Sequence, residues 1–253
     1  MGLIKYNMSN ENTTWSASYK EYERGAEQYI LSLDNRAARM TRIMENAMRI
    51  FTEFIYGYLP AAGEMEWPVL KPNYDISVGK EHLVPFHEAY SYGITKDVIH
   101  FFEADNLFTR IFCNPCKYLP FLRNCKGVIG PDLSQYTDMP AEMRYRHAWC
   151  NVTMSTYLQE ESVNLYPNVT WSKGDSFFYS CPRNLASSVI AINSNAVHRS
   201  SLSLYRWKKG YEFVTRELHP IHIVRYGQPV DGEMTGISSY HVNERLKMLR
   251  NGR

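Results

Sequence analysis

Short apolar segments that end in polar or aromatic residues constrain the fold of this chain more than any other feature. Four of them are Gly127–Ser134, Val163–Ser172, Ser188–Asn195 and Ile221–Gly227. Each has the length and apolar composition of a buried β-strand. Segments with helical patterns separate them, and strands that alternate with helices are typical of parallel βαβ units. The sequence therefore predicts an α/β fold with a parallel sheet.

The expected architecture is a TIM-barrel-like arrangement of βαβ units, closed or incomplete, with an N-terminal helical extension. Residues 98–102 have the composition of a further strand of the same kind. An open doubly wound sheet is the alternative, because it is built from the same units. In both architectures ligands bind beyond the carboxyl ends of the strands.

Changes in composition divide the chain into successive regions. Residues 1–58 hold a polar, loosely held arm and then a helix, for which Asp34 is the expected N-cap. Residues 59–97 are punctuated by proline and glycine and are expected to form a loop-rich connector. Residues 98–230 carry the α/β core, and residues 231–253 form a polar C-terminal tail or helix.

The composition is that of a globular protein without a strong charge. Of the 253 residues, 44% are hydrophobic, and the formal net charge of +2 gives no sign of nonspecific nucleic-acid binding. No segment approaches the apolar length of about 18 residues that a membrane span needs. The first residues lack the apolar core of a signal peptide, and five cysteines without such a signal fit a reducing compartment. We therefore expect a cytoplasmic protein without a membrane partner.

Several of these segments also resemble a known family. Gly130–Pro140, Tyr166–Ser172 and Val224–Gly227 are similar in order and spacing to the domain of unknown function 4417 family of bacteria and phages. The resemblance covers about residues 95–230. It implies a phage, plasmid or prophage context in a bacterial host cell, and it implies no particular activity. One departure is Asn193–Ala196, where glycine is expected.

Carboxylates at the strand ends are the leading candidates for chemistry. Asp132 follows an apolar strand, where a carboxylate can act as a general base, bind a metal or fix a ligand hydroxyl. The alternative for Asp132 is a structural turn in which it accepts local backbone amides. Glu103 and Asp105 end the preceding strand and are candidates to pair with Asp132, and Ser134 supplies a hydroxyl beside them.

The later strand ends supply amides, rings and a histidine. Asn168 and Asn195 are candidates to bind a ligand through hydrogen bonds, and Tyr226 offers a ring. Trp171 is a candidate stacking platform, with a buried core position as the alternative. His198 follows a predicted strand and is the histidine best placed for acid–base work.

The common cofactor motifs are missing from the sequence. Cys113 and Cys116 have zinc-knuckle spacing, but no second pair of this spacing accompanies them. The sequence has no Walker A motif and no dinucleotide-binding glycine pattern. It therefore predicts no metal site and identifies no cofactor.

Three functions remain open from the sequence. The first is a pocket protein of a mobile element that binds or converts a small polar, nucleotide-like ligand at the strand ends. The second is a nucleic-acid-binding protein of phage replication or packaging, and the third is a scaffold or a partner of a host protein. The second would use basic residues of the first helix and of the tail, namely Arg36, Arg39, Arg42, Arg49, Arg245, Lys247, Arg250 and Arg253. The sequence does not decide whether the protein is an enzyme, nor its oligomeric state.

Overall fold

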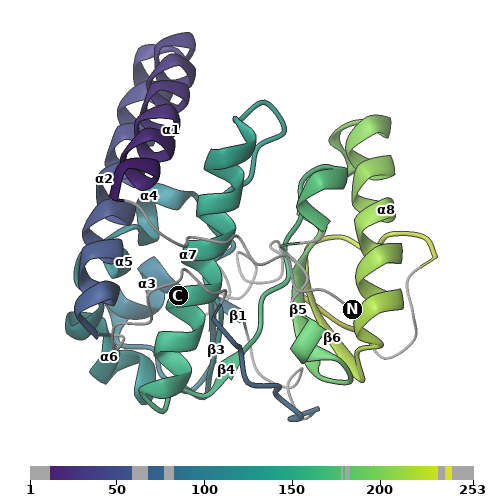
Figure 1. Cartoon of the computed structure of the whole chain (residues 1–253). Coiled ribbons are helices and arrows are strands. Elements are labelled where there is room, and N and C mark those ends of the chain that lie inside the picture. The colour runs from purple at the N-terminus through teal and green to yellow at the C-terminus, as the bar shows by residue number, and fades with distance from the viewer. Residues whose placement is uncertain are drawn as a thin grey trace.

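The computed structural model describes residues 12–58, 68–76, 83–177, 179, 183–195, 197–232 and 237–240. Within these ranges the protein is a mixed α/β structure in which all strand pairings are parallel (Figure 1). The strands are β1 (Leu83–Pro85), β2 (Val98–His100), β3 (Gly127–Ile129), β4 (Leu165–Tyr166), β5 (Val189–Asn193), β6 (His222–Tyr226) and β7 (Ile237–Tyr240). The α-helices are α1 (Asn12–Ser32), α2 (Asn35–Tyr58), α3 (Phe86–Tyr92), α4 (Asp105–Phe108), α5 (Arg110–Cys113), α6 (Pro115–Arg123), α7 (Ala141–Glu160) and α8 (Ser201–Leu218). The predicted α/β class with parallel strands is confirmed.

The strands follow one another in chain order. One sheet has the order β1-β2-β3-β4 and the other has the order β5-β6-β7. A parallel bridge between Asn168 and Ala191 joins the end of β4 to β5. Two backbone hydrogen bonds support it, from Val169 N–H to the Ala191 carbonyl at 2.9 Å and from Ala191 N–H to the Pro167 carbonyl at 2.8 Å. Among the described strands the order shows no reversal of the kind that defines a doubly wound sheet.

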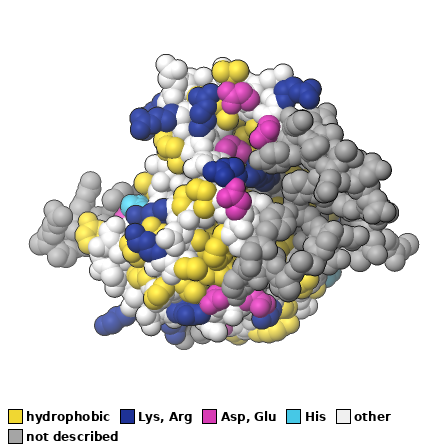
Figure 2. All heavy atoms as spheres, turned by 60° about the vertical axis from the view of Figure 1, so that its left-hand side comes forward, with side chains coloured by type: hydrophobic (Ala, Val, Ile, Leu, Met, Phe, Trp, Pro, Cys, Tyr) yellow, Lys and Arg dark blue, Asp and Glu magenta, His cyan; other side chains and the backbone are white. Residues whose placement is uncertain are grey.

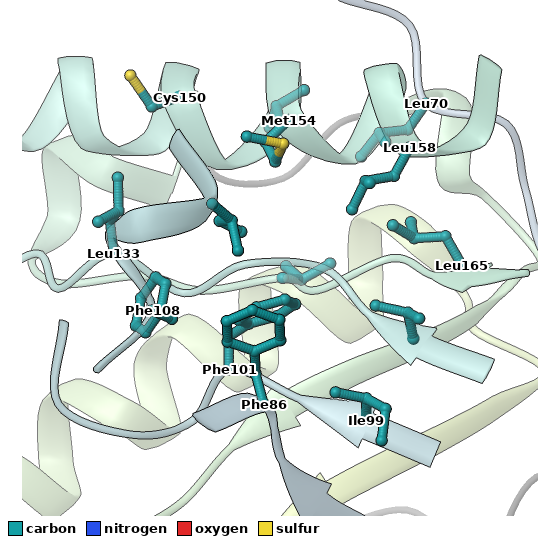
Figure 3. Close-up of a cluster of buried hydrophobic side chains, with 14 of the residues drawn as sticks. Leu70, Phe86, Ile99, Phe101, Phe108, Leu133, Cys150, Met154, Leu158 and Leu165 are labelled. Atoms are coloured by element: carbon teal, nitrogen blue, oxygen red, sulfur yellow. The ribbon is translucent and has the colours of Figure 1, made fainter. Parts of the chain in front are cut away.

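Alternate strand residues face two different clusters, as the period of two in a β-strand requires. One face packs against helices, and Figure 3 shows Ile99 and Leu165 of this face with Met154 and Leu158 of α7. The opposite face forms a second cluster of side chains from β1 to β6. In this cluster the ring of Tyr226 on β6 stacks on Phe102, just after β2, with 5.5 Å between centroids. Since β2 and β6 are not paired, the two sheets must curve toward each other to allow this contact.

The N-terminal region packs more closely on the core than the sequence suggests. Asp34 precedes α2, and its Oδ1 accepts hydrogen bonds from the backbone N–H groups of Arg36 and Ala37, both at 2.9 Å, so the predicted cap is present. Where a loosely held arm was expected, residues 12–32 form α1. Phe51 of α2 is fully buried and contacts Phe112 edge to face at 5.3 Å. The helix α2 is therefore part of the main core.

The sheet extends beyond the region predicted as the α/β core. The strand β1 and the helix α3 lie in the expected connector, and β7 lies in the expected tail. Also in the connector, Asn73 bridges the amino ends of β4 and β5. The side-chain amide of Asn73 donates to the Leu165 carbonyl at 2.9 Å, and the backbone carbonyl of Asn73 accepts from Val189 N–H at 2.7 Å. The segment that reads as a linker thus supplies a strand and closes the gap between the two sheets.

Candidate functional site

Polar side chains gather where the parallel strands end. Glu103, Asp132, Asn168, Asn193 and Tyr226 lie at or just beyond the carboxyl ends of β2, β3, β4, β5 and β6. All of them are half-buried. Because parallel strands end at the same edge of a sheet, these side chains share one edge of the molecule. We call this set the carboxyl-edge cluster.

Asp132 is the shared acceptor of this cluster. Its Oδ1 accepts from the Asn168 amide at 3.1 Å, and its Oδ2 accepts from the Asn193 amide at 3.5 Å. Burial raises the pKa of Asp132, and hydrogen bonds from Asn168, Asn193 and Thr170 act in the opposite direction. The carboxylate is therefore held by side chains from the neighbouring strand ends rather than by its own turn.

Two features of the neighbouring residues keep the cluster close together. A Cβ atom at Gly130 would lie 2.5 Å from the Ser155 hydroxyl oxygen, so only glycine lets the end of β3 pass this close to α7. The Asn168 amide nitrogen also donates to the Pro131 carbonyl at 3.0 Å, which fixes the orientation of the amide.

The Oδ1 atom of Asn168 is buried and has no hydrogen-bond partner among the described residues. This oxygen is an acceptor that a ligand could satisfy.

Asp105 and Ser134 form a second polar group beside Asp132. The Asp105 Oδ1 atom accepts from both the backbone N–H and the hydroxyl of Ser134, each at 3.1 Å. Nδ1 of His147, a buried residue of α7, lies 2.5 Å from the Ser134 carbonyl oxygen and donates to it. Burial raises the pKa of Asp105 to about 6, the His147 charge and the Ser134 hydrogen bonds lower it, and the Asp132 charge raises it. Asp105 and Asp132 thus interact electrostatically, while Asp105 itself organises the loop after β3.

Glu103 pairs with a histidine that sequence reasoning missed. His87 is the second residue of α3, directly after β1, and its Nδ1 atom forms a hydrogen-bonded ion pair with Glu103 Oε2. The backbone N–H of His87 also donates to Glu103 Oε1 at 3.2 Å. Burial raises the pKa of Glu103, and the contacts with His87 work against this rise. In the sequence, the short strand β1 lies among prolines and glycines, and no apolar pattern marks it. His87 is therefore not recognisable from the sequence as a residue at a strand end.

His100, the last residue of β2, is a second histidine beside the cluster that the sequence did not single out. Its Nδ1 accepts from Phe102 N–H at 3.0 Å, so its proton is on Nε2, which is buried without a hydrogen-bond partner among the described residues. Burial, and then the nearby His87 charge, lower the pKa of His100 to about 3. The Tyr226 ring lies 4.5 Å from the His100 ring, and burial followed by the Glu103 charge raises the pKa of Tyr226. His100 is therefore a neutral donor beside the cluster.

Two other predicted residues lie at the end of β5 but make different contacts. The exposed His198 donates from Nε2 to the Pro229 carbonyl at 2.9 Å, which ties its turn to the segment after β6. The backbone N–H of the exposed Asn195 donates to Asn193 Oδ1 at 2.8 Å. A Cβ atom at Gly227, where φ is +118°, would lie 2.5 Å from Asn195 N, so this glycine permits the close approach of the two loops. Among the hydrogen bonds of the described residues, neither side chain is bonded to Asp132.

Trp171 is half-buried and packs against the main core. Its ring packs 5.6 Å from that of Trp207 on α8, and it fills the space where a Cβ atom of Gly210 would be. Trp207 in turn donates from Nε1 to the Asn193 carbonyl at 2.8 Å. Trp171 therefore supports the end of β5 from the helix side.

A separate hollow lies between the N-terminal helices and α7. It has a volume of about 390 Å³ and is lined by Tyr22, Glu23, Ala26, Glu27, Ile30, Arg42, Glu45, Asn46, Arg49 and Arg146. Arg42 pairs with Glu27 at 3.0 Å, and Arg49 pairs with Glu53 at 2.6 Å. Figure 2 shows basic and acidic side chains interspersed on this side of the molecule. The predicted basic face is thus of mixed charge, and Arg245, Lys247, Arg250 and Arg253 lie outside the described residues.

Neither a metal centre nor a membrane span occurs in the part of the chain that the structure describes. In those ranges there is no group of three or more histidine, cysteine, aspartate or glutamate side chains that could hold a metal ion. The helices described there are too short or too polar to cross a membrane.

These observations define an α/β protein with parallel strands and a polar cluster at their carboxyl edge. The chain belongs to the family described as Domain of unknown function (DUF4417), whose model matches residues 59–241. The match begins earlier than the resemblance predicted from the sequence, and it includes all of β1 to β7.

Two phage proteins are similar to the chain. The Gene 1 protein of Mycobacterium phage D29 is 23% identical over 174 residues, which cover 67% of this chain and 63% of that protein. The Gene 1 protein of Mycobacterium phage L5 is 25% identical over 149 residues, which cover 57% of this chain and 63% of that protein. The chain thus spans less than two thirds of the length of these relatives, and no solved structure matches it. Together with the family, these relatives support a phage or mobile-element origin.

Proposed function

We propose that this protein binds a small polar, nucleotide-like ligand at the carboxyl-edge cluster. The observation that carries the proposal is the arrangement around Asp132, where half-buried polar side chains from successive strand ends converge. A structural turn would be satisfied by local backbone amides, whereas Asp132 is bound by amides that come from β4 and β5. The same edge is where α/β proteins hold their ligands.

The proposal includes an architecture for the site. We propose that β1 to β7 form an incomplete TIM-like barrel, with the contact between Tyr226 and Phe102 in its interior. Chain-order strands, parallel pairing and the bridge from Asn168 to Ala191 support this arrangement. In such a barrel the carboxyl-edge cluster would surround the mouth.

The chemistry of the cluster favours a ligand with several hydroxyl groups and a ring. The Asp132 carboxylate and the buried Asn168 Oδ1 atom are acceptors for hydroxyl or amino groups. His100 supplies a neutral donor, and Tyr226 supplies a ring at the same edge. A nucleoside combines these complementary groups, and the protein would act on it in the cytoplasm of a bacterial host cell.

A thermal-shift screen tests the proposal. The panel contains nucleotides, cyclic dinucleotides, sugars, divalent metals and short oligonucleotides, since a ligand that binds only the folded state raises the melting temperature. We expect a shift with one nucleotide-like class that is lost in Asp132→Ala. The matched control is Asp97→Ala, which removes a half-buried aspartate at the amino end of β2 and should keep the shift.

The other outcomes of the screen separate the alternative functions. A shift produced only by oligonucleotides would contradict the small-ligand proposal and favour the nucleic-acid-binding function. A flat screen would direct the search to a scaffold role or to host proteins. An Asp132→Ala variant that is folded and still shows the full shift would exclude Asp132 from the site.

A further inference from the structure

We propose that His87 and Glu103 form the acid–base pair of the carboxyl-edge cluster, so that this site transfers a proton to or from its bound ligand. The inference rests on the proposed function, because it makes the proposed ligand site a catalytic one. From the sequence, Glu103 is a candidate to pair with Asp132, and His87 is not singled out.

The position of the pair follows from the sheet topology. The adjacent parallel strands β1 and β2 end at the same edge. His87 lies in the first turn of α3, directly after β1, and Glu103 lies in the segment between β2 and α4. The Glu103 side chain is 6% exposed, whereas the His87 side chain is 35% exposed. The carboxylate is thus shielded from water while the imidazole is accessible, and a general base oriented by a buried acid has this arrangement.

The contacts fix which nitrogen of His87 is available. Nδ1 faces the Glu103 carboxylate, which can only accept, so Nδ1 carries the proton when the ring is neutral. Nε2 then bears the lone pair, and its nearest charged neighbour is Glu88 Oε1 at 3.7 Å. The Arg110 guanidinium lies over the ring of Phe86, the residue before His87, at 5.1 Å. Burial raises the pKa of Glu103, and the contacts with His87 and then the Arg110 charge act against this rise. Glu103 therefore orients the ring, and Nε2 is the atom that exchanges protons.

The pair is connected to Asp132 through the strand ends. The Tyr226 ring stacks at 5.5 Å on Phe102, the residue before Glu103, and burial followed by the Glu103 charge raises the pKa of Tyr226. Tyr226 is opposite Asn193 in the parallel register of β5 and β6, and the Asn193 amide donates to Asp132. A ligand held by Asp132 thus lies on the same edge as His87, and the unpaired Nε2–H of His100 is beside the Tyr226 ring.

The proposed step is a proton transfer. Nε2 of the neutral His87 takes a proton from a ligand hydroxyl or from a water molecule and becomes part of an imidazolium ion. The Nδ1 proton remains hydrogen-bonded to Glu103, whose negative charge stabilises that ion. When water gives the proton, its oxygen bonds to the phosphorus of a bound nucleotide or cyclic dinucleotide as a phosphorus–oxygen bond of that compound breaks. The imidazolium then gives the Nε2 proton to the departing oxygen, and the pair is restored.

The tautomer of His87 in the free, wild-type protein provides the first test. Nitrogen-15 NMR of the histidine rings at alkaline pH, where free imidazole is neutral, reports which nitrogen carries the proton. We expect the proton on Nδ1 of His87, although free histidine favours the opposite tautomer. A proton on Nε2 would overturn the inference, and this test needs neither a ligand nor a variant.

Conversion of the bound compounds provides the second test. Each nucleotide or cyclic dinucleotide that raises the melting temperature is incubated with the wild type, His87→Gln and His219→Asn, and the products are followed by chromatography. We expect conversion by the wild type and a rate at least about 100-fold lower in His87→Gln, with the thermal shift retained. His219→Asn, at the exposed end of α8, should match the wild type.

The outcomes distinguish the two proposals. If compounds bind but are not converted, or if His87→Gln converts them as fast as the wild type, the acid–base inference is wrong and the binding proposal stands. If no compound binds, the binding proposal has failed, and the acid–base inference that rests on it fails as well, whichever tautomer His87 adopts.

Discussion

At the scale of single residues, the cluster keeps ionisable groups away from water at a cost in stability. Asp105 is 7% exposed and His100 is 1% exposed. Burial moves both pKa values in the direction that favours the neutral form, up for Asp105 and down for His100. Such costs are common where function requires polar groups in a partly dry site.

Asp105 gives a pH dependence with a definite sign. Its pKa is about 6 in the folded state against 3.8 for the unfolded reference, so the folded protein binds more protons between these values. Stability should therefore fall as pH rises from about 4 to 6, by about 3 kcal/mol in total from this residue, and level off above that range. Asp105→Asn keeps an oxygen for Ser134 but does not ionise. The unfolding free energy of the variant minus that of the wild type should therefore rise by this amount between pH 4 and 7. Urea unfolding at both pH values measures this difference, and a constant difference would contradict the account.

Individual site residues were predictable only where their position along a strand indicated them. Asp132 and Asn168 follow the short apolar segments that form β3 and β4, and their side chains are hydrogen-bonded to each other in the structure. His87 follows β1, which has only three residues and lies among prolines and glycines, so no periodicity marks it. For Trp171, the sequence position fits a ligand-stacking ring and a core residue equally well. Its packing on Gly210 is visible only in the structure.

At the scale of secondary-structure elements, close packing fixes α8 against the strand ends. A Cβ atom at Gly210 would lie 2.2 Å from ring atoms of Trp171, so Gly210→Ala must displace that ring or the helix. We expect a loss of about 1–3 kcal/mol in the free energy of unfolding. Gly25→Ala is the matched control, since nothing lies within 4 Å of its Cβ position in α1, and it should stabilise the helix by up to about 1 kcal/mol. Chemical denaturation of both variants checks this, and a stable Gly210→Ala variant would contradict it.

A largely buried carboxylate lies between α2 and α7. The Glu45 side chain is 15% exposed, accepts a hydrogen bond from Tyr22, and lies 3.5 Å from Arg146 and 3.7 Å from His147. Although burial raises the pKa of Glu45, His147, Tyr22 and Arg146 lower it below its usual value.

Removing this carboxylate leaves Arg146 without its charge partner, so Glu45→Ala should cost about 3 kcal/mol of stability. Glu53→Ala on the same helix removes an exposed pair with Arg49 and should cost less than about 1 kcal/mol. Thermal unfolding of the two variants compares them directly, and equal losses would show that the Glu45 contacts carry no special weight.

Elements with strong periodicity were predictable, and short or irregular ones were not. The apolar segments around Val128, Ile190 and Ile223 are strands in the structure, and Asp34 precedes a helix as expected. The strand β1 lies in the region predicted as a loop-rich connector, and β7 lies in the region predicted as a polar tail or helix. Their own sequences do not indicate strands, and pairing with a neighbouring strand stabilises them.

At the scale of the whole molecule, the packed core extends beyond the residues that match the family model. The family match spans residues 59–241 and ends just beyond β7, while α1 and α2 precede it. The helix α2 nevertheless packs into the main core, and Glu45 links it through His147 to the loop that carries Ser134. We therefore expect removal of α1 and α2 to destabilise the domain rather than to release an independent unit, which an unfolding experiment on residues 59–253 would check. A truncated chain as stable as the full protein would contradict this expectation.

The central claim is that a ligand binds at the carboxyl edge of the parallel strands. A crystal structure of the protein with the nucleotide-like compound that gives the largest thermal shift tests it most directly. The account predicts that this compound contacts Asp132 and Asn168 and lies beside Tyr226. A compound bound instead in the hollow between α1, α2 and α7 would contradict the account.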